Sequence, residues 1–441
     1  MNALEKKYNF FSLIKFTIPT IIMMIFMSLY TMVDGMFVSV LINENALSSI
    51  NLVYPAQSVI IAVSIMLATG SSAIIASLLG EQKSNEAREN FTFIIIISLI
   101  IGLLFSIIGL NYINQIVSLL GASEITKEYC VDYLSIIILA SPLAVLQMIN
   151  QYLFVTAGKP TIGLVTTIIG GILNIVLDYI FIKFLNFGIS GAAIATAVGY
   201  SIPSIYGLIY FAKNRNGLLY FVKPKINFSM LFKSCYNGSS EMITNLASSV
   251  TVFLFNMIML KYIGIDGVAA ITIVMYGQYL SNSLFMGYSS GVAPLISYNY
   301  GHNRKKELKK INRYSLIFIS VSSLIVFTLS YLCSDLITCL FVDPEKPVYE
   351  ITKEGFKLFS ISYLLTGINI YVSALFTALS NGLLSGIISF LRTFLNLTTC
   401  LILLPMLIGE KGIWLSVPLA ETLTVIISLI LLMKYKNNYN L

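Results

Sequence analysis

The sequence predicts an all-α membrane protein with 12 transmembrane helices in two parallel six-helix lobes. Hydrophobic residues make up 57% of the chain and charged residues only 11%, whereas a soluble domain has about 25% charged residues. A spanning helix needs about 20 apolar residues, so 441 residues with short loops have room for about twelve. The two halves of the chain also resemble each other, which predicts the two lobes.

Short polar loops separate the apolar segments and define the expected spans. These spans are 11–41, 46–79, 91–118, 129–155, 161–186, 190–212, 230–263, 267–300, 312–341, 352–378, 384–408 and 411–434. The first is too long for the apolar core of a signal peptide, which has about 7–15 residues. We therefore expect it to be an uncleaved helix.

The distribution of basic residues predicts the orientation in the membrane. With the N-terminus inside, 19 of the 27 Lys and Arg residues fall on the inner side and seven on the outer side, while Arg392 lies within a helix. Basic residues concentrate in cytoplasmic loops, so we expect a multi-pass protein of the cell inner membrane with both termini in the cytoplasm. The net charge of +7 then reflects topology, and no nucleic-acid partner is expected.

An internal repeat with an offset of about 221 residues relates the two halves. The segment from Gly70 to Gly80 aligns with that from Gly291 to Gly301, and each precedes a charged loop. Six helices per half give both copies the same orientation, related by an axis along the membrane normal. The expected division is an N-terminal lobe at 1–212, a cytoplasmic linker at 213–229 and a C-terminal lobe at 230–441.

Two carboxylates within apolar spans are the strongest functional signal. Asp34 and Asp178 each cost about 2.5–3.5 kcal/mol at the bilayer centre on insertion scales. Together with Thr196 they lie roughly 9–12 Å below the outer ends of their helices, at 1.5 Å per residue. Asn174 is one turn from Asp178 on the same helix face. If these helices touch, the four side chains can hold Na⁺, or one carboxylate can bind a proton.

The second half lacks matching carboxylates, so we expect ion coupling in the N-terminal lobe alone. Near the positions that match Asp34 and Asp178 it carries uncharged side chains, namely Asn256, Thr399 and Cys400, and Asn396 matches Asn174. Three other charges lie about eight to ten residues inside its spans: Glu241, Arg392 and Glu421. Arg392 can form a buried ion pair with either glutamate, or Glu241 can face a cleft and attract a cationic substrate.

Polar side chains at helical spacing predict either contacts between helices or the lining of a wet cleft. The candidates for the cleft are Asn51, Tyr54, Glu241, Gln278 and Asn282. With 16 Met, 26 Tyr and 27 Phe residues, an adaptable aromatic wall for lipophilic cations is available. The five cysteines lack metal-ligand spacing, and the single histidine, His302, excludes a histidine-based metal site or triad within the membrane.

Taken in order, the motifs resemble the multidrug and toxic compound extrusion (MATE) family over about residues 10–435. They are Pro19 followed by 33–38 around Asp34, 70–80 with Glu86 and Ala87, Gly158-Lys159-Pro160 with Asn174 and Asp178, and 292–301. The resemblance implies a V of two lobes that opens alternately to each side and exports organic cations in exchange for Na⁺ or H⁺. It also implies a cation site at Asp34, Asn174, Asp178 and Thr196. Glu241 resembles the helix 7 glutamate of another branch, but no carboxylate lies near Ser373.

These features predict an antiporter that is not an enzyme and needs no cofactor, with Na⁺ or H⁺ as the coupling ion. Its expected partners are small organic cations and the lipid bilayer, and we expect a monomer. The alternative is a lipid-linked oligosaccharide flippase of the same superfamily, which would need an arginine-lined cavity; Arg392 is the only candidate. A membrane-embedded transferase would need Asp-rich metal motifs or a catalytic His at the membrane surface, and the sequence has neither.

Overall fold

The computed structural model describes residues 3–439 and 441, and the described chain is helical without strands. In order the elements are η1 (Ala3–Glu5), α1 (Phe10–Leu41), α2 (Glu44–Gly80), α3 (Ser84–Asn111), α4 (Ile113–Leu119), α5 (Glu124–Leu139), α6 (Ser141–Thr156), α7 (Pro160–Tyr179), η2 (Ile180–Phe184), α8 (Gly188–Lys213), α9 (Phe228–Tyr262), α10 (Ile265–Gly301), α11 (Lys305–Leu332), α12 (Ser334–Cys339), α13 (Pro347–Ser360), α14 (Tyr363–Ala378), α15 (Gly382–Phe390), η3 (Leu391–Leu395), α16 (Asn396–Ile408) and α17 (Glu410–Tyr439). η2 and η3 are π-helical turns inside longer helices.

Within the described part of the chain, nine helices are long and apolar enough to cross a membrane, and two bent pairs add further spans. The bent pairs are α5 with α6, at 54°, and α13 with α14, at 49°. α10 is 37 residues long but is not apolar enough to be counted among these spans, and it packs against α1 and α2 as well as its own half of the chain. The all-α fold predicted from the sequence is confirmed.

The two bends lie within the expected spans 129–155 and 352–378, and the sequence did not predict them. In the first, the chain breaks at Ala140 and restarts with Pro142 in the first turn of α6. Proline has no N–H and disfavours a helical residue before it, so a break here costs little. A Cβ on Gly102 of α3 would come within 2.4 Å of the Pro142 Cα, so α3 packs directly against the break.

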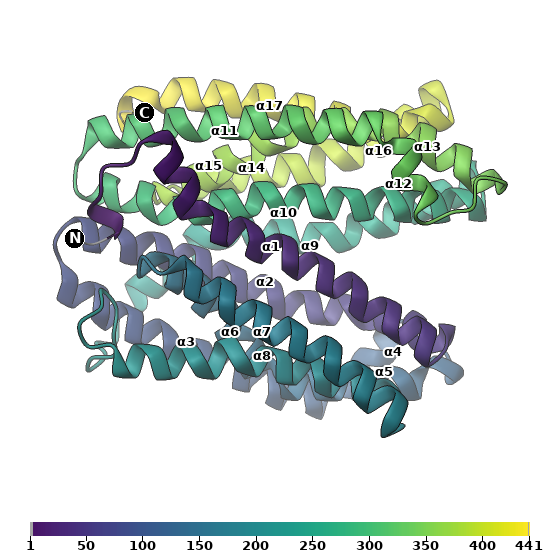
Figure 1. Cartoon of the computed structure of the whole chain (residues 1–441), viewed down its shortest axis with the longest axis horizontal. Helices are drawn as coiled ribbons and strands as arrows, with labels where there is room; N and C mark the ends of the chain where they lie inside the picture. The colour runs from purple at the N-terminus through teal and green to yellow at the C-terminus, as the bar shows by residue number, and fades with distance from the viewer. Residues whose placement is uncertain (1–2, 440) are drawn as a thin grey trace.

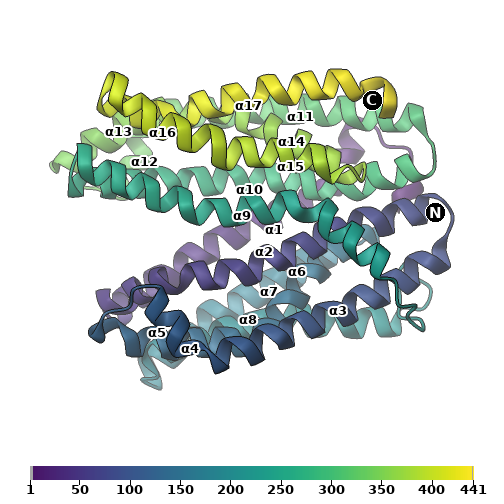
Figure 2. The same cartoon turned by 180° about the vertical axis from the view of Figure 1, so that it is seen from behind.

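The helices form two bundles that meet at one end (Figure 1). We call α1–α8 the N-terminal lobe and α9–α17 the C-terminal lobe. Both chain termini lie at the end where the lobes meet, which we call the terminal end (Figures 1 and 2). Toward the opposite end the bundles diverge, so the shape is a V (Figures 1 and 2).

Glycines allow the two lobes to touch through their backbones near the terminal end. A Cβ on Gly70 of α2 would lie 1.9 Å from the Ser234 carbonyl oxygen of α9, and one on Gly238 would lie 1.9 Å from that of Met66. Real Cβ atoms do not approach backbone so closely, so only glycine fits at either position. These reciprocal contacts keep α2 and α9 together.

The ends of α2 and α10 form a second contact between the lobes. A Cβ on Gly80 would meet the Tyr298 carbonyl oxygen at 2.1 Å, and one on Gly301 would meet that of Ser77 at 2.2 Å. The imidazole Nδ1 of His302 lies 2.7 Å from the Gly80 carbonyl oxygen. The repeated glycines of the sequence therefore pack against each other.

The N-terminal segment covers this closed end. Leu4 is fully buried, and the Arg304 guanidinium donates to the Glu5 carbonyl oxygen at 3.0 Å. The Tyr8 hydroxyl donates to the Ala3 carbonyl oxygen at 2.7 Å, and burial raises the pKa of Tyr8 to about 12, so this donor stays protonated. Glu5, which precedes α1, thus binds Arg304, which precedes α11 in the other lobe.

Between the lobes, residues 214–227 are not helical and lie against α3. The Arg88 Nε donates to the Leu218 carbonyl oxygen at 3.1 Å, and its guanidinium lies over the Tyr220 ring at 4.3 Å. Phe221 stacks on Phe91 with ring centroids 5.4 Å apart. The connection is therefore anchored on the N-terminal lobe.

Substituting Gly238 by Val should open the terminal end. Its side chain would overlap the Met66 backbone, and overpacking of this kind costs about 1–3 kcal/mol, enough to shift the ratio of closed to open molecules about 5- to 150-fold. The check is a distance measurement between spin labels at Asn85 and Lys306, which should lengthen. The control is Gly386→Ala, because a Cβ there meets only the Ser239 hydroxyl at 4.0 Å. An unchanged distance in Gly238→Val would contradict this role for the glycine contact.

Candidate cation site and the cleft between the lobes

Close packing of α1, α7 and α8 brings the four predicted site residues into one region of the N-terminal lobe. A Cβ on Gly170 of α7 would lie 2.6 Å from the Gly199 carbonyl oxygen of α8. A Cβ on Gly171 would lie 2.5 Å from the Phe26 ring of α1. Neighbouring glycines therefore let α7 approach both partners, one turn away from the polar side chains that follow.

Three of the four site residues are buried: Asp178 is 0% exposed, Asn174 2% and Thr196 9%. The Asn174 amide donates to the Thr196 hydroxyl at 3.4 Å, so its carbonyl oxygen is free for another partner. Asp34, on α1, lies with its carboxyl group directly beside that of Asp178. The structure thus places the predicted residues together.

The oxygens of this site lack donors. Asp34 Oδ1, Asn174 Oδ1 and both carboxylate oxygens of Asp178 are buried without a hydrogen-bond partner. None of the ion pairs among the described residues involves either aspartate. A buried acceptor without a donor costs about 1–3 kcal/mol, and more if it is charged. Hard oxygen ligands suit Na⁺, and a proton on one carboxyl would supply the missing donor.

Four further residues border the site, and the sequence did not single them out as members of it. Tyr30, Gln147 and Tyr200 line a cavity of about 10 Å³ next to Asn174, and Tyr133 lies within electrostatic range of both aspartates. Gln147 belongs to a polar stripe that the sequence shows. The tyrosines could not be distinguished, because they are three among 26.

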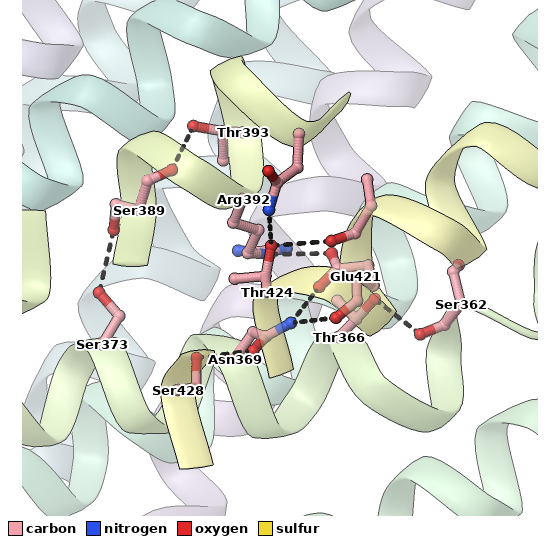
Figure 3. Close-up of polar contacts among 12 residues, drawn as sticks. Ser362, Thr366, Asn369, Ser373, Ser389, Arg392, Thr393, Glu421, Thr424 and Ser428 are labelled. Carbon is pink, nitrogen blue, oxygen red and sulfur yellow. Dashed lines mark hydrogen bonds and ion pairs between the residues drawn. The ribbon is translucent and has the colours of Figure 1, made fainter. Parts of the chain in front are cut away.

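In the C-terminal lobe Arg392 forms an ion pair with Glu421, with the Nε 2.9 Å from Oε1 (Figure 3). This resolves one of the two pairings that the sequence left open. Asn369 donates to Oε2 of the same carboxylate at 2.7 Å. Asn396, which matches Asn174 in the repeat, donates to the Thr424 hydroxyl at 3.0 Å.

The predicted cleft residues fall into two groups. Asn51 and Tyr54 are exposed on α2, and Gln278 and Asn282 are half-buried on α10. Tyr279, beside Gln278, lies within electrostatic range of Tyr54 across the two lobes. These side chains lie beyond the last hydrogen bond between α2 and α9, which joins the hydroxyls of Ser58 and Ser249 at 3.4 Å.

Glu241 belongs to a separate cavity nearer the terminal end. This space of about 40 Å³ lies between the lobes and is lined by residues of α2, α6, α9, α10 and α14. Tyr152, Thr69 and Ser289 line it with Glu241, and the Ser289 hydroxyl has no hydrogen-bond partner. The structure therefore does not bring Glu241 together with Asn51 and Tyr54.

Two repeated helical lobes around a partly closed cleft, with an oxygen-lined site in one of them, define a membrane transporter. The model of the MatE family matches residues 19–180 and 242–402, so the chain belongs to the MatE family. The same model matches each half once, at starts 223 residues apart, which supports the internal repeat.

Similar proteins agree with this assignment. The chain is 27% identical over 435 residues to the multidrug export protein MepA of Staphylococcus haemolyticus (strain JCSC1435), covering 98% of this chain and 95% of that protein. It is 25% identical over 432 residues to MepA of Staphylococcus aureus (strain MRSA252), covering 97% and 94%.

Solved structures show the same fold. An outward-facing multidrug resistance MATE family transporter of the MOP superfamily aligns with a TM-score of 0.91 at 22% identity, covering 97% of this chain and 96% of that chain. A MATE structure in the bent conformation aligns with a TM-score of 0.87 at 22% identity and the same coverage. The predicted family and fold are confirmed.

Substituting Asp178 by Asn should raise thermal stability in the absence of a bound cation. The amide supplies donors beside Asp34 and removes one buried charge. The wild type, by contrast, should become more stable when Na⁺ or acid is added. A ligand at 100 times its Kd raises the free energy of unfolding by about 2.7 kcal/mol. The variant should show little of this increase. Thermal unfolding of the purified proteins with Na⁺ replaced by K⁺ measures both effects. Glu128→Gln, on the exposed surface of the same lobe, is the control; an equal response of Asp178→Asn and wild type would refute a cation site here.

Proposed function

We propose that the protein exports lipophilic or cationic organic compounds in exchange for Na⁺ or H⁺ that binds at Asp34, Asn174, Asp178 and Thr196. The observation that carries the proposal is the group of four buried acceptor oxygens without donors in one lobe. Export of drugs is supported by membership of the MatE family and by the similarity to multidrug export proteins. The proposal needs no cofactor, because the gradient supplies the energy.

Helix α1 is the element that can connect the cation site to the lobe interface. It carries Asp34 toward α7, and it packs along α10 of the other lobe. The hydroxyls of Ser28 and Ser283 are in direct contact across that interface. A Cβ on Gly287 of α10 would lie 2.6 Å from the Ile21 Cα of α1. A shift of α1 on cation binding therefore changes contacts between the lobes.

In the proposed cycle the V opens to the outside, and the terminal end lies in the cytoplasm, as the basic residues predict. A cation enters from outside and binds between Asp34 and Asp178, α1 shifts, and the drug is released. We propose that the lobes at 1–212 and 230–441 then move as units about the linker at 213–229. Each charge that crosses the membrane contributes about 2.3 kcal/mol per 100 mV.

The drug site proposed here lies in the outer part of the cleft. Tyr54 and Tyr279 come from different lobes and lie within electrostatic range of each other, and Asn51, Gln278 and Asn282 are on the same two helices. Aromatic faces attract organic cations by about 0.5–2 kcal/mol each, and an exposed aromatic wall accepts different shapes. Asn282 Oδ1 has no hydrogen-bond partner and is available to a ligand.

The flippase alternative is less well supported by the charges in the cleft. Binding a phosphate-linked sugar needs free basic groups. Arg392 was the only candidate, and its guanidinium is already paired with Glu421. A monomer in the inner membrane remains our expectation.

Export of ethidium from vesicles tests the coupling. Separate Na⁺ and pH gradients should differ in effect, and loss of export when K⁺ replaces Na⁺ at fixed pH identifies Na⁺. Asp34→Asn and Asp178→Asn should each lower gradient-driven export by about tenfold or more, which is 1.4 kcal/mol of lost coupling. Glu128→Gln should export like the wild type. If both aspartate variants export normally at normal expression, the coupling site lies elsewhere.

Removing the Tyr54 ring should weaken drug binding while the ion dependence stays unchanged. Loss of a cation–π contact of about 0.5–2 kcal/mol raises the KM for ethidium about 2- to 30-fold, and Tyr279→Ala should behave alike. Tyr54→Phe retains the ring and should stay near the wild type. The control is Tyr112→Ala, since Tyr112 is exposed and lies between α3 and α4. A KM that does not change in either alanine variant argues against this location.

A further inference from the structure

The structure allows the two lobes to be matched residue by residue. Gly158 and Ser380 occupy corresponding turns with positive φ, 72° and 59°, and differ by 222 in number. Gly188 and Gly409 occupy the next corresponding turns, with φ 55° and 67°, and differ by 221. With the offset of the first pair, α6 and α7 correspond to α14, α15 and α16. With the offset of the second pair, α8 corresponds to α17.

This match relates the small N-lobe cavity to the ion pair of the C-lobe. The corresponding residues are Gln147 and Asn369, Gly170 and Arg392, and Tyr200 and Glu421. The first member of each pair lines the cavity next to Asn174. The second members bind one another (Figure 3). At corresponding positions of the repeat, the N-terminal lobe therefore has a cavity and the C-terminal lobe has an ion pair.

The chemistry of the two places is complementary. In the N-lobe a glycine stands at the matched position, and acceptor oxygens nearby lack donors. In the C-lobe the long side chain of Arg392 fills the space, and its guanidinium and Glu421 are 11% and 5% exposed. Both carboxylate oxygens of Glu421 have a donor, from Arg392 at 2.9 Å and Asn369 at 2.7 Å.

Local backbone and neighbouring groups hold Arg392 in place. It lies in the π-helical turn η3, and such turns re-aim side chains inside helices. The Ser428 hydroxyl donates to Asn369 Oδ1 at 2.9 Å, which orients the amide toward Glu421. Glu241 is the other carboxylate whose charge acts on Arg392, and it is not in an ion pair within the described chain.

We propose that the C-terminal lobe contains the repeat-related counterpart of the cavity beside the cation site, and that the Arg392 guanidinium fills it as a permanently attached cation. Only the N-lobe then exchanges a cation with the medium. This second part rests on the proposed function, whereas occupancy by Arg392 does not. An arginine stays charged under all physiological conditions, so the C-lobe cannot release its cation during a cycle.

Chemical rescue tests the occupancy. Arg392→Ala should lower the melting temperature of the purified full-length protein, because it leaves Glu421 buried without its cation. Ethylguanidinium at millimolar concentration restores the missing atoms and should recover at least half of that loss, saturably. It should do nothing to the wild type or to Arg392→Ala/Glu421→Gln at equal ionic strength. No saturable recovery, or equal recovery in the double variant, would overturn the proposal.

A neutral pair tests the second part and also covers the case in which Arg392→Ala fails to fold. Arg392→Gln/Glu421→Gln retains hydrogen bonding without charge and should fold. Its gradient-driven export of ethidium should keep the wild-type dependence on the coupling cation, within about twofold. A larger shift would show that the C-lobe pair takes part in coupling and overturn the proposal. If the wild type itself lacks gradient-driven export, the proposed function fails, while the rescue still decides occupancy.

Discussion

Unmet hydrogen-bonding capacity at Asp34 and Asp178 is the constraint on which the rest of the structure depends. Within a bilayer no water reaches a helix interior to compensate for a missing donor. Most of the protein satisfies this demand internally: serine and threonine hydroxyls bond to carbonyl oxygens one turn back, and Glu421 has two donors. The N-lobe site is different, because four acceptor oxygens there have no donor. Such a site is stable only if something from outside completes it.

Asp34 lies on a helix that contacts both lobes, so cation binding at the site can affect the contact between them. Asp34 is on α1, and α1 packs on α7 of its own lobe and on α10 of the other. The glycines of α10 leave no room between the two backbones, so a displacement of α1 cannot be absorbed by side chains alone. Closely packed interfaces change between discrete arrangements rather than deforming continuously. In the proposed mechanism, a small change at the site is therefore transmitted to the contact that closes the terminal end.

Much of this could be predicted from the sequence. The all-α fold, the repeat and the grouping of the four predicted site residues follow from apolar length, from glycines at one offset and from depth along a helix. The breaks at Ala140 and after Ser360 could not be predicted, because a short turn inside an apolar run leaves the composition unchanged. The separation of Glu241 from Tyr54 could not be predicted either. Both residues face the interface, and their positions along the membrane normal depend on how α9 and α2 are aligned. That alignment is set by backbone contacts at Gly70 and Gly238.

The two lobes show how a repeat can lose its functional symmetry without losing its fold. Gly170 lines a small cavity in the N-terminal lobe, whereas the matching residue of the other lobe, Arg392, carries a long side chain that pairs with Glu421. A buried arginine requires a carboxylate close by, so Glu421 and Arg392 depend on each other. Asp34 and Asp178 have no such partner in the described chain, and in the proposed mechanism they take one from the medium. The difference between a fixed and an exchangeable cation thus follows from which partner is covalently attached. In the proposed mechanism the C-terminal lobe keeps its cation, and the N-terminal lobe alone responds to an ion gradient.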